Sequence, residues 1–162
     1  MSDDFDVLLQ DAYRYACALT HNDTVAEDIV QDACVSIIKA GGSWDRPYLF
    51  SAVRARFIDS YRRQRRAGAR LTLNPNGAVK GISSPPAGCE IERRDRLRSL
   101  DNALAKLRPT EREALFLTEV QGYTAQQVAD QTQRSRGTVL SLLKRSRQKL
   151  RELLSPSECE VG

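Results

Sequence analysis

The chain has 162 residues, of which 41% are hydrophobic and 28% charged, and its net charge is +4. A chain of this length forms one ordinary domain or two small ones, and the composition is that of a globular protein rather than a disordered or fibrous one. The sequence contains no apolar run of the ~18 residues that cross a bilayer. Its N-terminus lacks the basic start and apolar core of a signal peptide, so we expect a cytoplasmic protein without membrane insertion.

The charges are divided unevenly along the chain. Residues 1–45 hold nine acids and two bases, a net charge of −7, so the remaining residues carry +11. Seven cations lie in Arg54–Arg70 and seven in Arg134–Arg151, enough for each run to neutralise several phosphates and release their counterions. A single run could be only a solvated helix face, but two runs on separate helices favour a polyanion as partner. The net negative charge of residues 1–45 favours a protein partner with a basic surface.

The cysteines argue against a metal centre. Cys17, Cys34, Cys89 and Cys159 have no C-x-x-C spacing, and His21 is the single histidine. This set does not match the ligand spacing of zinc sites, so we expect neither a metal nor another cofactor. Cys17 and Cys34 fall on the apolar stripes of predicted helices, where a buried thiol is the ordinary expectation.

Two helices are predicted before residue 42. Apolar residues recur at i, i+3, i+4 and i+7 in Phe5–Leu19 and again in Val25–Ile38, which is the one-sided stripe of an amphipathic helix. Thr24, followed three residues later by Glu27, can form a capping box that opens the second helix. Gly41 can end it.

A third helix and a linker follow. Asp45 and Pro47 predict the helix start, and the arginines of the first basic run face outward from it. The residues expected to face inward are Leu49, Ala52, Val53, Phe57 and Tyr61. From Ala67 to about Cys89 the apolar period is replaced by Gly, Pro, Ser and Asn, which predicts a flexible linker.

Four more helices are predicted after the linker, and no strands. The fourth is marked by Leu97, Leu100, Leu104 and Leu107. Thr110 with Glu113 is expected to cap a fifth helix, which ends near Gly122.

Thr124 with Gln127 is expected to cap a short sixth helix, and Ser135 to start a long basic seventh with Val139 and Leu143 in the core. A short helix, a turn and a longer basic helix predict a helix-turn-helix, whose second helix enters the DNA major groove.

Several motifs together carry a family resemblance. They are Ala26-Glu-Asp-Ile-Val-Gln-Asp-Ala33, Tyr48-Leu-Phe, Leu107-Arg-Pro, Gly122-Tyr-Thr and Gly137-Thr-Val139. The chain resembles the bacterial RNA polymerase sigma factors of the extracytoplasmic-function (ECF) group, and the first motif is the most specific because generic helix-turn-helix proteins lack it.

The resemblance implies an all-α fold of two small helical domains. Residues 1–66 would form a three-helix domain like sigma region 2, and residues 93–154 a four-helix domain like sigma region 4. Residues 67–92 would be the flexible linker and residues 155–162 a tail.

The polar face of the second helix is the predicted polymerase site. Glu27, Asp28, Gln31 and Asp32 lie opposite the apolar stripe of that helix. The resemblance implies that this face binds the coiled-coil of the beta-prime subunit of core RNA polymerase. The alternative is a set of solvent-exposed acids without a partner.

Two sets of residues are predicted to contact promoter DNA. For the −10 element, double-stranded and then melted, the candidates are Trp44, Tyr48, Arg54, Arg56, Arg62, Arg63, Arg65 and Arg66. For the −35 element they are Arg136, Thr138, Ser141, Lys144, Arg145 and Arg147. Each aromatic near the third helix, Phe50 included, could instead pack in the core, and Trp44 in the loop is the best base-contact candidate.

The chain departs from the family pattern at several positions. The segment 40–46 is shorter than usual, and Ala55 stands where an asparagine is common. Leu140 and Leu142 occupy positions that are commonly basic, and Gln133 replaces a turn glycine. These departures predict altered contacts to both promoter elements.

The implied function is that of a sigma factor: it binds core RNA polymerase and directs promoter-specific initiation by melting the −10 element and binding the −35 element. Such a protein catalyses nothing itself and is commonly held inactive by an anti-sigma factor. The alternative is a stand-alone helix-turn-helix regulator that binds DNA without polymerase. A nucleic-acid enzyme such as a recombinase would need a supported nucleophile or clustered carboxylates, which the N-terminal half does not offer.

Overall fold

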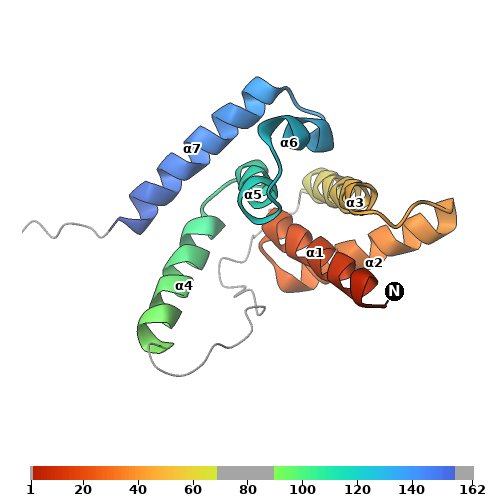
Figure 1. Ribbon diagram of the computed structural model, residues 1–162, viewed down its shortest axis with the longest axis horizontal. Helices are drawn as coiled ribbons and strands as arrows, with labels where there is room; N and C mark the ends of the chain where they lie inside the picture. The colour runs from red at the N-terminus through yellow and green to blue at the C-terminus, as the bar shows by residue number, and fades with distance from the viewer. Residues whose placement is uncertain (1, 69–89, 156–162) are drawn as a thin grey trace, which may run out of the picture.

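A computed structural model describes residues 2–68 and 90–155, and all regular secondary structure within these ranges is helical (Figure 1). The elements in chain order are α1 (Ser2–Thr20), α2 (Asp23–Ala40), α3 (Arg46–Arg66), α4 (Glu90–Ala105), α5 (Pro109–Leu115), the π-helical turn η1 (Phe116–Val120), α6 (Ala125–Thr132) and α7 (Arg136–Leu154). The predicted all-α class is therefore confirmed. Nearly all of the predicted linker falls outside the described residues, and α4 begins at Glu90, three residues before the expected second domain.

The first three helices pack around a common apolar core. It is formed by Ala12, Ala16, Leu19, Ala26, Ile29, Ala33, Ile37, Leu49, Phe50 and Val53. The apolar stripes predicted from the sequence supply nearly all of these side chains. Three residues of the predicted apolar stripes are not core residues, because Phe5 is 40%, Ile38 68% and Tyr61 39% exposed. Each stands near one end of its helix.

The start of α2 also differs from the prediction. Asn22, not Thr24, is the N-cap, and its side chain accepts a 3.1 Å hydrogen bond from the backbone N–H of Val25. Asparagine is the stronger cap, and Asn22 has the extended backbone that this position requires. Gly41 ends the helix in the left-handed conformation, with φ 61°, and Asp45 caps α3, both as predicted.

The start of α5 lies two residues earlier than expected. Pro109 stands in the first turn, where its fixed φ suits a helix and its missing N–H costs nothing. The carboxylate of Glu111 accepts a 3.0 Å hydrogen bond from the backbone N–H of Arg108. The predicted cap by Thr110 and Glu113 is therefore wrong, and Glu113 is buried instead.

The helix-turn-helix forms as predicted. Thr124 and Gln127 make a reciprocal capping box at the start of α6, and Ser135 caps α7. The turn between them passes through Gln133, whose φ of 55° lies in the left-handed region that favours glycine. Val139 and Leu143 bury their side chains toward α5 and α6.

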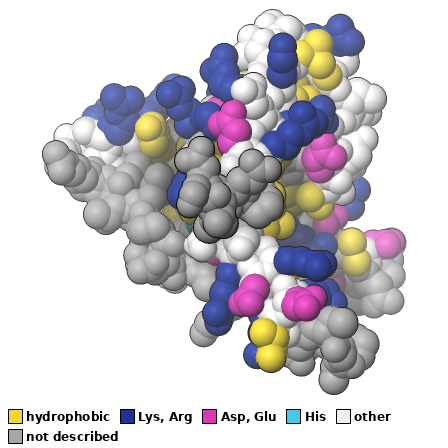
Figure 2. Space-filling view, turned by 90° about the vertical axis from the view of Figure 1, so that its left-hand side faces the viewer, with side chains coloured by type: hydrophobic (Ala, Val, Ile, Leu, Met, Phe, Trp, Pro, Cys, Tyr) yellow, Lys and Arg dark blue, Asp and Glu magenta, His cyan; other side chains and the backbone are white. Residues whose placement is uncertain are grey.

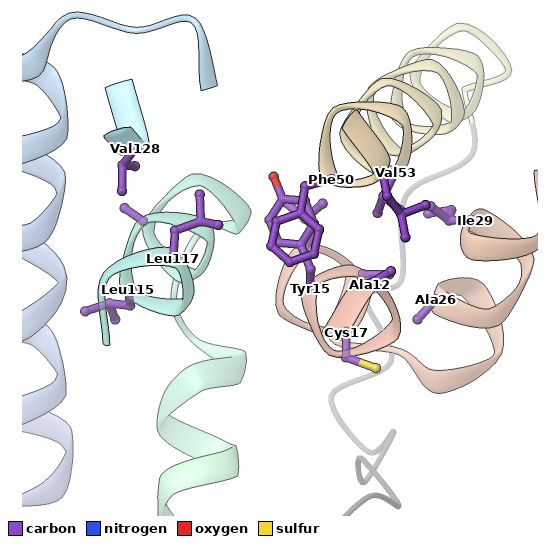
Figure 3. Close-up of a cluster of buried hydrophobic side chains, with 14 of the residues drawn as sticks. Ala12, Tyr15, Cys17, Ala26, Ile29, Phe50, Val53, Leu115, Leu117 and Val128 are labelled. Carbon is purple, nitrogen blue, oxygen red and sulfur yellow. The ribbon is translucent and has the colours of Figure 1, made fainter. Parts of the chain in front are cut away.

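The N-terminal and C-terminal halves share one hydrophobic core. α1 packs against α5 and α3 against α6 (Figure 1). The ring of Tyr15 stacks on Phe50 with a centroid distance of 4.6 Å and on Phe116 with 5.8 Å. Leu115, Leu117 and Val128 continue the apolar cluster on the C-terminal side (Figure 3).

Candidate nucleic-acid and protein interfaces

The acidic face of α2 forms as predicted. Glu27, Asp28, Gln31 and Asp32 are all exposed, while Ile29 on the opposite side of the helix is buried. The face is wider than the sequence suggested, because Glu27 and Gln31 also line an open groove between α1 and α2. The other polar residues of that groove are Asp6, Gln10 and Tyr13. Nothing in the helical period of α1 alone indicated that it would extend this acidic surface.

The aromatic residues near the start of α3 separate into two kinds. Phe50 is fully buried and belongs to the core. Trp44 is 39% exposed and sets its ring edge-on to Phe5 of α1, with a centroid distance of 5.2 Å. Tyr48 is 41% exposed, and its ring lies so close to Gly42 that a Cβ there would come within 2.5 Å of it. Trp44 and Tyr48 therefore remain accessible at one loop.

The arginines of α3 differ in their accessibility. Arg62, Arg63, Arg65 and Arg66 are exposed at the C-terminal end of the helix, and Arg56 is half-buried. The basic character is not confined to this helix: Lys and Arg side chains are scattered across the face of the molecule seen in Figure 2. The exposed end of α3 can therefore approach a phosphate backbone.

Arg54 is held by a residue of the C-terminal half. Its Nε donates a 2.9 Å hydrogen bond to Oε1 of Glu113, and its side chain is only 17% exposed. The same carboxylate oxygen accepts a 2.5 Å hydrogen bond from the hydroxyl of Tyr15. Burial and the neighbouring carboxylate raise the pKa of Tyr15 well above its usual value, so this hydroxyl stays protonated. This cluster could not be predicted from the sequence, because Tyr15 and Glu113 are 98 residues apart.

Arg112 makes a second contact between the halves. Its guanidinium donates from Nε to the carbonyl of Ala18 at 2.7 Å and from Nη2 to the carbonyl of Leu19 at 3.1 Å. It also donates to the carbonyl of Leu107 within its own half. Burial lowers the pKa of Arg112 to about 10. The guanidinium thus satisfies carbonyls at the C-terminal end of α1, which have no partner inside the helix.

The outward face of α7 carries most of the predicted −35 candidates. Arg136, Thr138, Ser141, Lys144 and Arg145 are exposed. Arg147 is exposed but forms an ion pair, since its Nη2 lies 2.6 Å from Oε1 of Glu119 on η1. The two unusual leucines also differ, because Leu140 is 43% exposed whereas Leu142 packs partly buried against the core.

Neither a metal nor a membrane site emerges from residues 2–68 and 90–155. In this part of the chain, no group of three or more His, Cys, Asp or Glu is arranged to hold a metal ion. None of the helices described combines the length and the apolar character needed to cross a bilayer. Cys17 is buried as predicted, and burial raises the pKa of its thiol to about 11.

Comparison with known proteins links both halves to one family. The family model described as Sigma-70 region 2 matches residues 5–67, and that described as Sigma-70, region 4 matches residues 97–150. The chain is similar to the RNA polymerase sigma factor CarQ of Myxococcus xanthus, with 28% identity over 157 residues, 91% of this chain and 85% of that protein. Its fold is similar to that of the sigma factor RpoE from Bartonella quintana, solved with the anti-sigma factor NepR. The TM-score is 0.67 and the identity 23%, and the match covers 96% of this chain and 97% of that one.

Proposed function

Because this chain belongs to the sigma-70 family, as a sigma factor of the ECF group with regions 2 and 4, we propose a division of labour among its helices. α2 docks on core RNA polymerase, α3 with its preceding loop reads and melts the −10 element, and α7 binds the −35 element. The single observation that carries this proposal is the exposed acidic face of α2 on the same small bundle as the exposed basic end of α3.

Docking through α2 follows from charge. Asp28 and Asp32 are exposed and lie one helical turn apart, so they present a negative ridge to a partner. A basic partner surface gains affinity and association rate from such complementarity. The coiled-coil of the beta-prime subunit is the polymerase surface that the family resemblance assigns to this ridge.

Reading of the −10 element depends on the exposed aromatics. Holding a base out of the DNA stack costs a few kcal/mol, and stacking on an aromatic side chain returns about 1–3 kcal/mol per base. Trp44 and Tyr48 offer two partly exposed rings at one loop. The arginines at the end of α3 supply the phosphate contacts that hold the strand in place.

Reading of the −35 element depends on α7. Its exposed Arg136, Thr138, Ser141, Lys144 and Arg145 combine hydrogen-bonding side chains with cations. Arg147 can join them by exchanging its ion pair with Glu119 for a contact with a phosphate. Breaking this ion pair costs little free energy, because both side chains are exposed.

The regulation and location of the protein extend the proposal. The similar sigma factor RpoE was solved with the anti-sigma factor NepR, and we assign an anti-sigma factor to this chain as well. It acts in the cytoplasm, where the polymerase is, and catalyses no reaction of its own. A stand-alone regulator is disfavoured because the region 2 match accounts for the N-terminal half.

Run-off transcription with purified core polymerase tests the proposal. Wild-type chain should give specific transcripts from some genomic promoter fragments, and Asp28→Lys with Asp32→Lys should abolish them together with co-purification of core enzyme. The matched control is Asp95→Lys on α4, another exposed acid on a helix, which should transcribe like wild type. A wild-type chain that never binds core polymerase, or a double variant that transcribes normally, contradicts the proposal.

A further inference from the structure

The N-terminal turns of α1 contact the loop that carries the exposed aromatics. This loop, residues 41–45, connects α2 to α3 and lies on the same side of the bundle as the start of α1 (Figure 1). The ring of Phe5 contacts that of Trp44 with a centroid distance of 5.2 Å and an angle of 74° between the ring planes. Phe5 is 40% exposed and lies outside the core cluster. Its ring contact therefore ties α1 to the loop rather than to the interior.

A second contact from α1 fixes the end of the same loop. Nη2 of Arg46, the first residue of α3, donates a 2.6 Å hydrogen bond to Oδ2 of Asp11. The Asp11 side chain is only 13% exposed, and salt screens a partly buried pair of this kind less than one in open solvent. The carboxylate of Asp45 accepts a 2.8 Å hydrogen bond from the backbone N–H of Tyr48. The backbone that follows Trp44 is therefore held in place, and Phe5 holds the indole itself.

Tyr48 occupies space that exists because residue 42 is a glycine. A Cβ on Gly42 would lie 2.5 Å from Cε1 and 2.7 Å from the hydroxyl oxygen of Tyr48, far closer than the 3.5–4.0 Å or so of a favourable contact between carbon atoms. Gly42 does not have the left-handed backbone that Gly41 has, so alanine is compatible with its backbone. Alanine at this position would therefore displace the Tyr48 ring without straining the chain.

We propose that Phe5 and Gly42 are positioning residues for the −10 element, with Phe5 acting through Trp44 and Gly42 through Tyr48. This inference rests on the proposed function, in which the two exposed rings stack on promoter bases that have left the duplex. Neither positioning residue needs to touch DNA. The rings of Phe5 and Trp44 are nearly perpendicular, so Phe5 supports the indole without stacking on it. A ring that is held before DNA binds loses less freedom when a base stacks on it, and such preorganisation raises affinity.

The fluorescence of Trp44 tests the first contact in the free chain, because Trp44 is the single tryptophan. Phe5→Leu keeps an apolar side chain but removes the ring. This variant should show a lower fluorescence anisotropy and a larger acrylamide quenching constant than wild type. The matched control is Val7→Ala on the same helix, since Val7 is 53% exposed, and it should behave like wild type. Unchanged anisotropy and quenching in Phe5→Leu overturn the role of Phe5.

Binding of the holoenzyme to a fork-junction promoter DNA is the second readout. The probe has a single-stranded −10 segment from a promoter that the run-off experiment has identified. Phe5→Leu and Gly42→Ala should each weaken this binding by about two- to tenfold, the range by which one aromatic contact shifts an equilibrium. Val7→Ala should bind like wild type. Core polymerase should bind all three variants equally, since none of them alters the acidic face of α2.

Double variants separate positioning from a general loss of structure. After Trp44→Ala, Phe5→Leu should weaken fork binding no further, and after Tyr48→Ala the same holds for Gly42→Ala, because each positioning residue acts only through its ring. Equal losses with and without the ring overturn the inference. Normal fork binding by either single variant overturns the role of that residue while the proposed function stands. A wild-type chain that never transcribes overturns the proposed function and this inference about DNA, whereas the fluorescence of the free chain still decides whether Phe5 holds Trp44.

Discussion

Replacing Arg112 by alanine should destabilise the whole chain strongly. The guanidinium is buried and donates to carbonyls of Ala18, Leu19 and Leu107. Alanine leaves these carbonyls without their donor and removes the side chain that fills the space between α1 and α5. Arg112 is therefore a place where one substitution acts on both halves at once.

The magnitude follows from the number of bonds lost. A hydrogen bond that involves a charged group contributes about 1.5–3 kcal/mol net. Part of this is offset because the variant no longer buries a guanidinium, whose desolvation is the cause that lowers the pKa of Arg112. A loss of about 3 kcal/mol remains, a large share of the roughly 5–15 kcal/mol that holds a typical domain folded.

Urea unfolding followed by far-UV circular dichroism measures this loss. The matched control is Arg14→Ala on α1, because the Arg14 side chain is 55% exposed and its contact to Asp11 is 3.9 Å long. An exposed pair of this kind contributes at most about 1 kcal/mol. If Arg112→Ala and Arg14→Ala lower the free energy of unfolding equally, the carbonyl contacts do not stabilise the chain and the reasoning is refuted.

Three further predictions concern pH, the turn and α7. Burial lowers the pKa of His21, the single histidine, so on acidification the imidazole is protonated in the unfolded chain before it is in the folded one. The free energy of unfolding should be highest above about pH 6.5 and fall below that pH by at most about 1.4 kcal/mol per pH unit. Urea unfolding of His21→Asn at several pH values should lack this slope. Gln133→Gly relieves a left-handed backbone and should raise the free energy of unfolding by up to about 1 kcal/mol; a lower melting temperature speaks against it. Leu140→Arg should steepen the salt dependence of −35 DNA binding by about one unit, whereas Leu142→Arg should mainly lower the melting temperature.

The sequence predicted those parts of the fold that depend on neighbouring residues. The apolar stripes located α1, α2 and α3, and the caps at Asp45 and Ser135 start their helices as expected. The wrong caps, at Thr24 and Thr110, failed because a stronger local signal stood nearby: asparagine at position 22 and proline at position 109. In both cases the observed N-cap, Asn22 or Arg108, lies two residues before the threonine that was predicted.

The charged residues of the candidate site could be predicted from the sequence, but the contacts that some of them make with the other half of the chain could not. The exposed acids of α2 and the exposed end of α3 could be recognised because helical period decides which side chains face water. Arg54 could not, since its accessibility depends on Glu113, 59 residues further along the chain. Helical periodicity relates only residues of the same helix. The contacts that join the two halves connect residues of different helices.

The two leucines of α7 show how the structure changes the meaning of a sequence departure. Leu142 is partly buried against the core, so it replaces a cation with a packing contact. Leu140 lies one turn from both Arg136 and Lys144 and is 43% exposed, so it interrupts an otherwise basic row on the face proposed to meet DNA. Only this position costs a phosphate contact. A weaker −35 contact would leave more of the proposed DNA binding to α3 and its preceding loop, so promoter selection should depend more on the −10 element than on the upstream one.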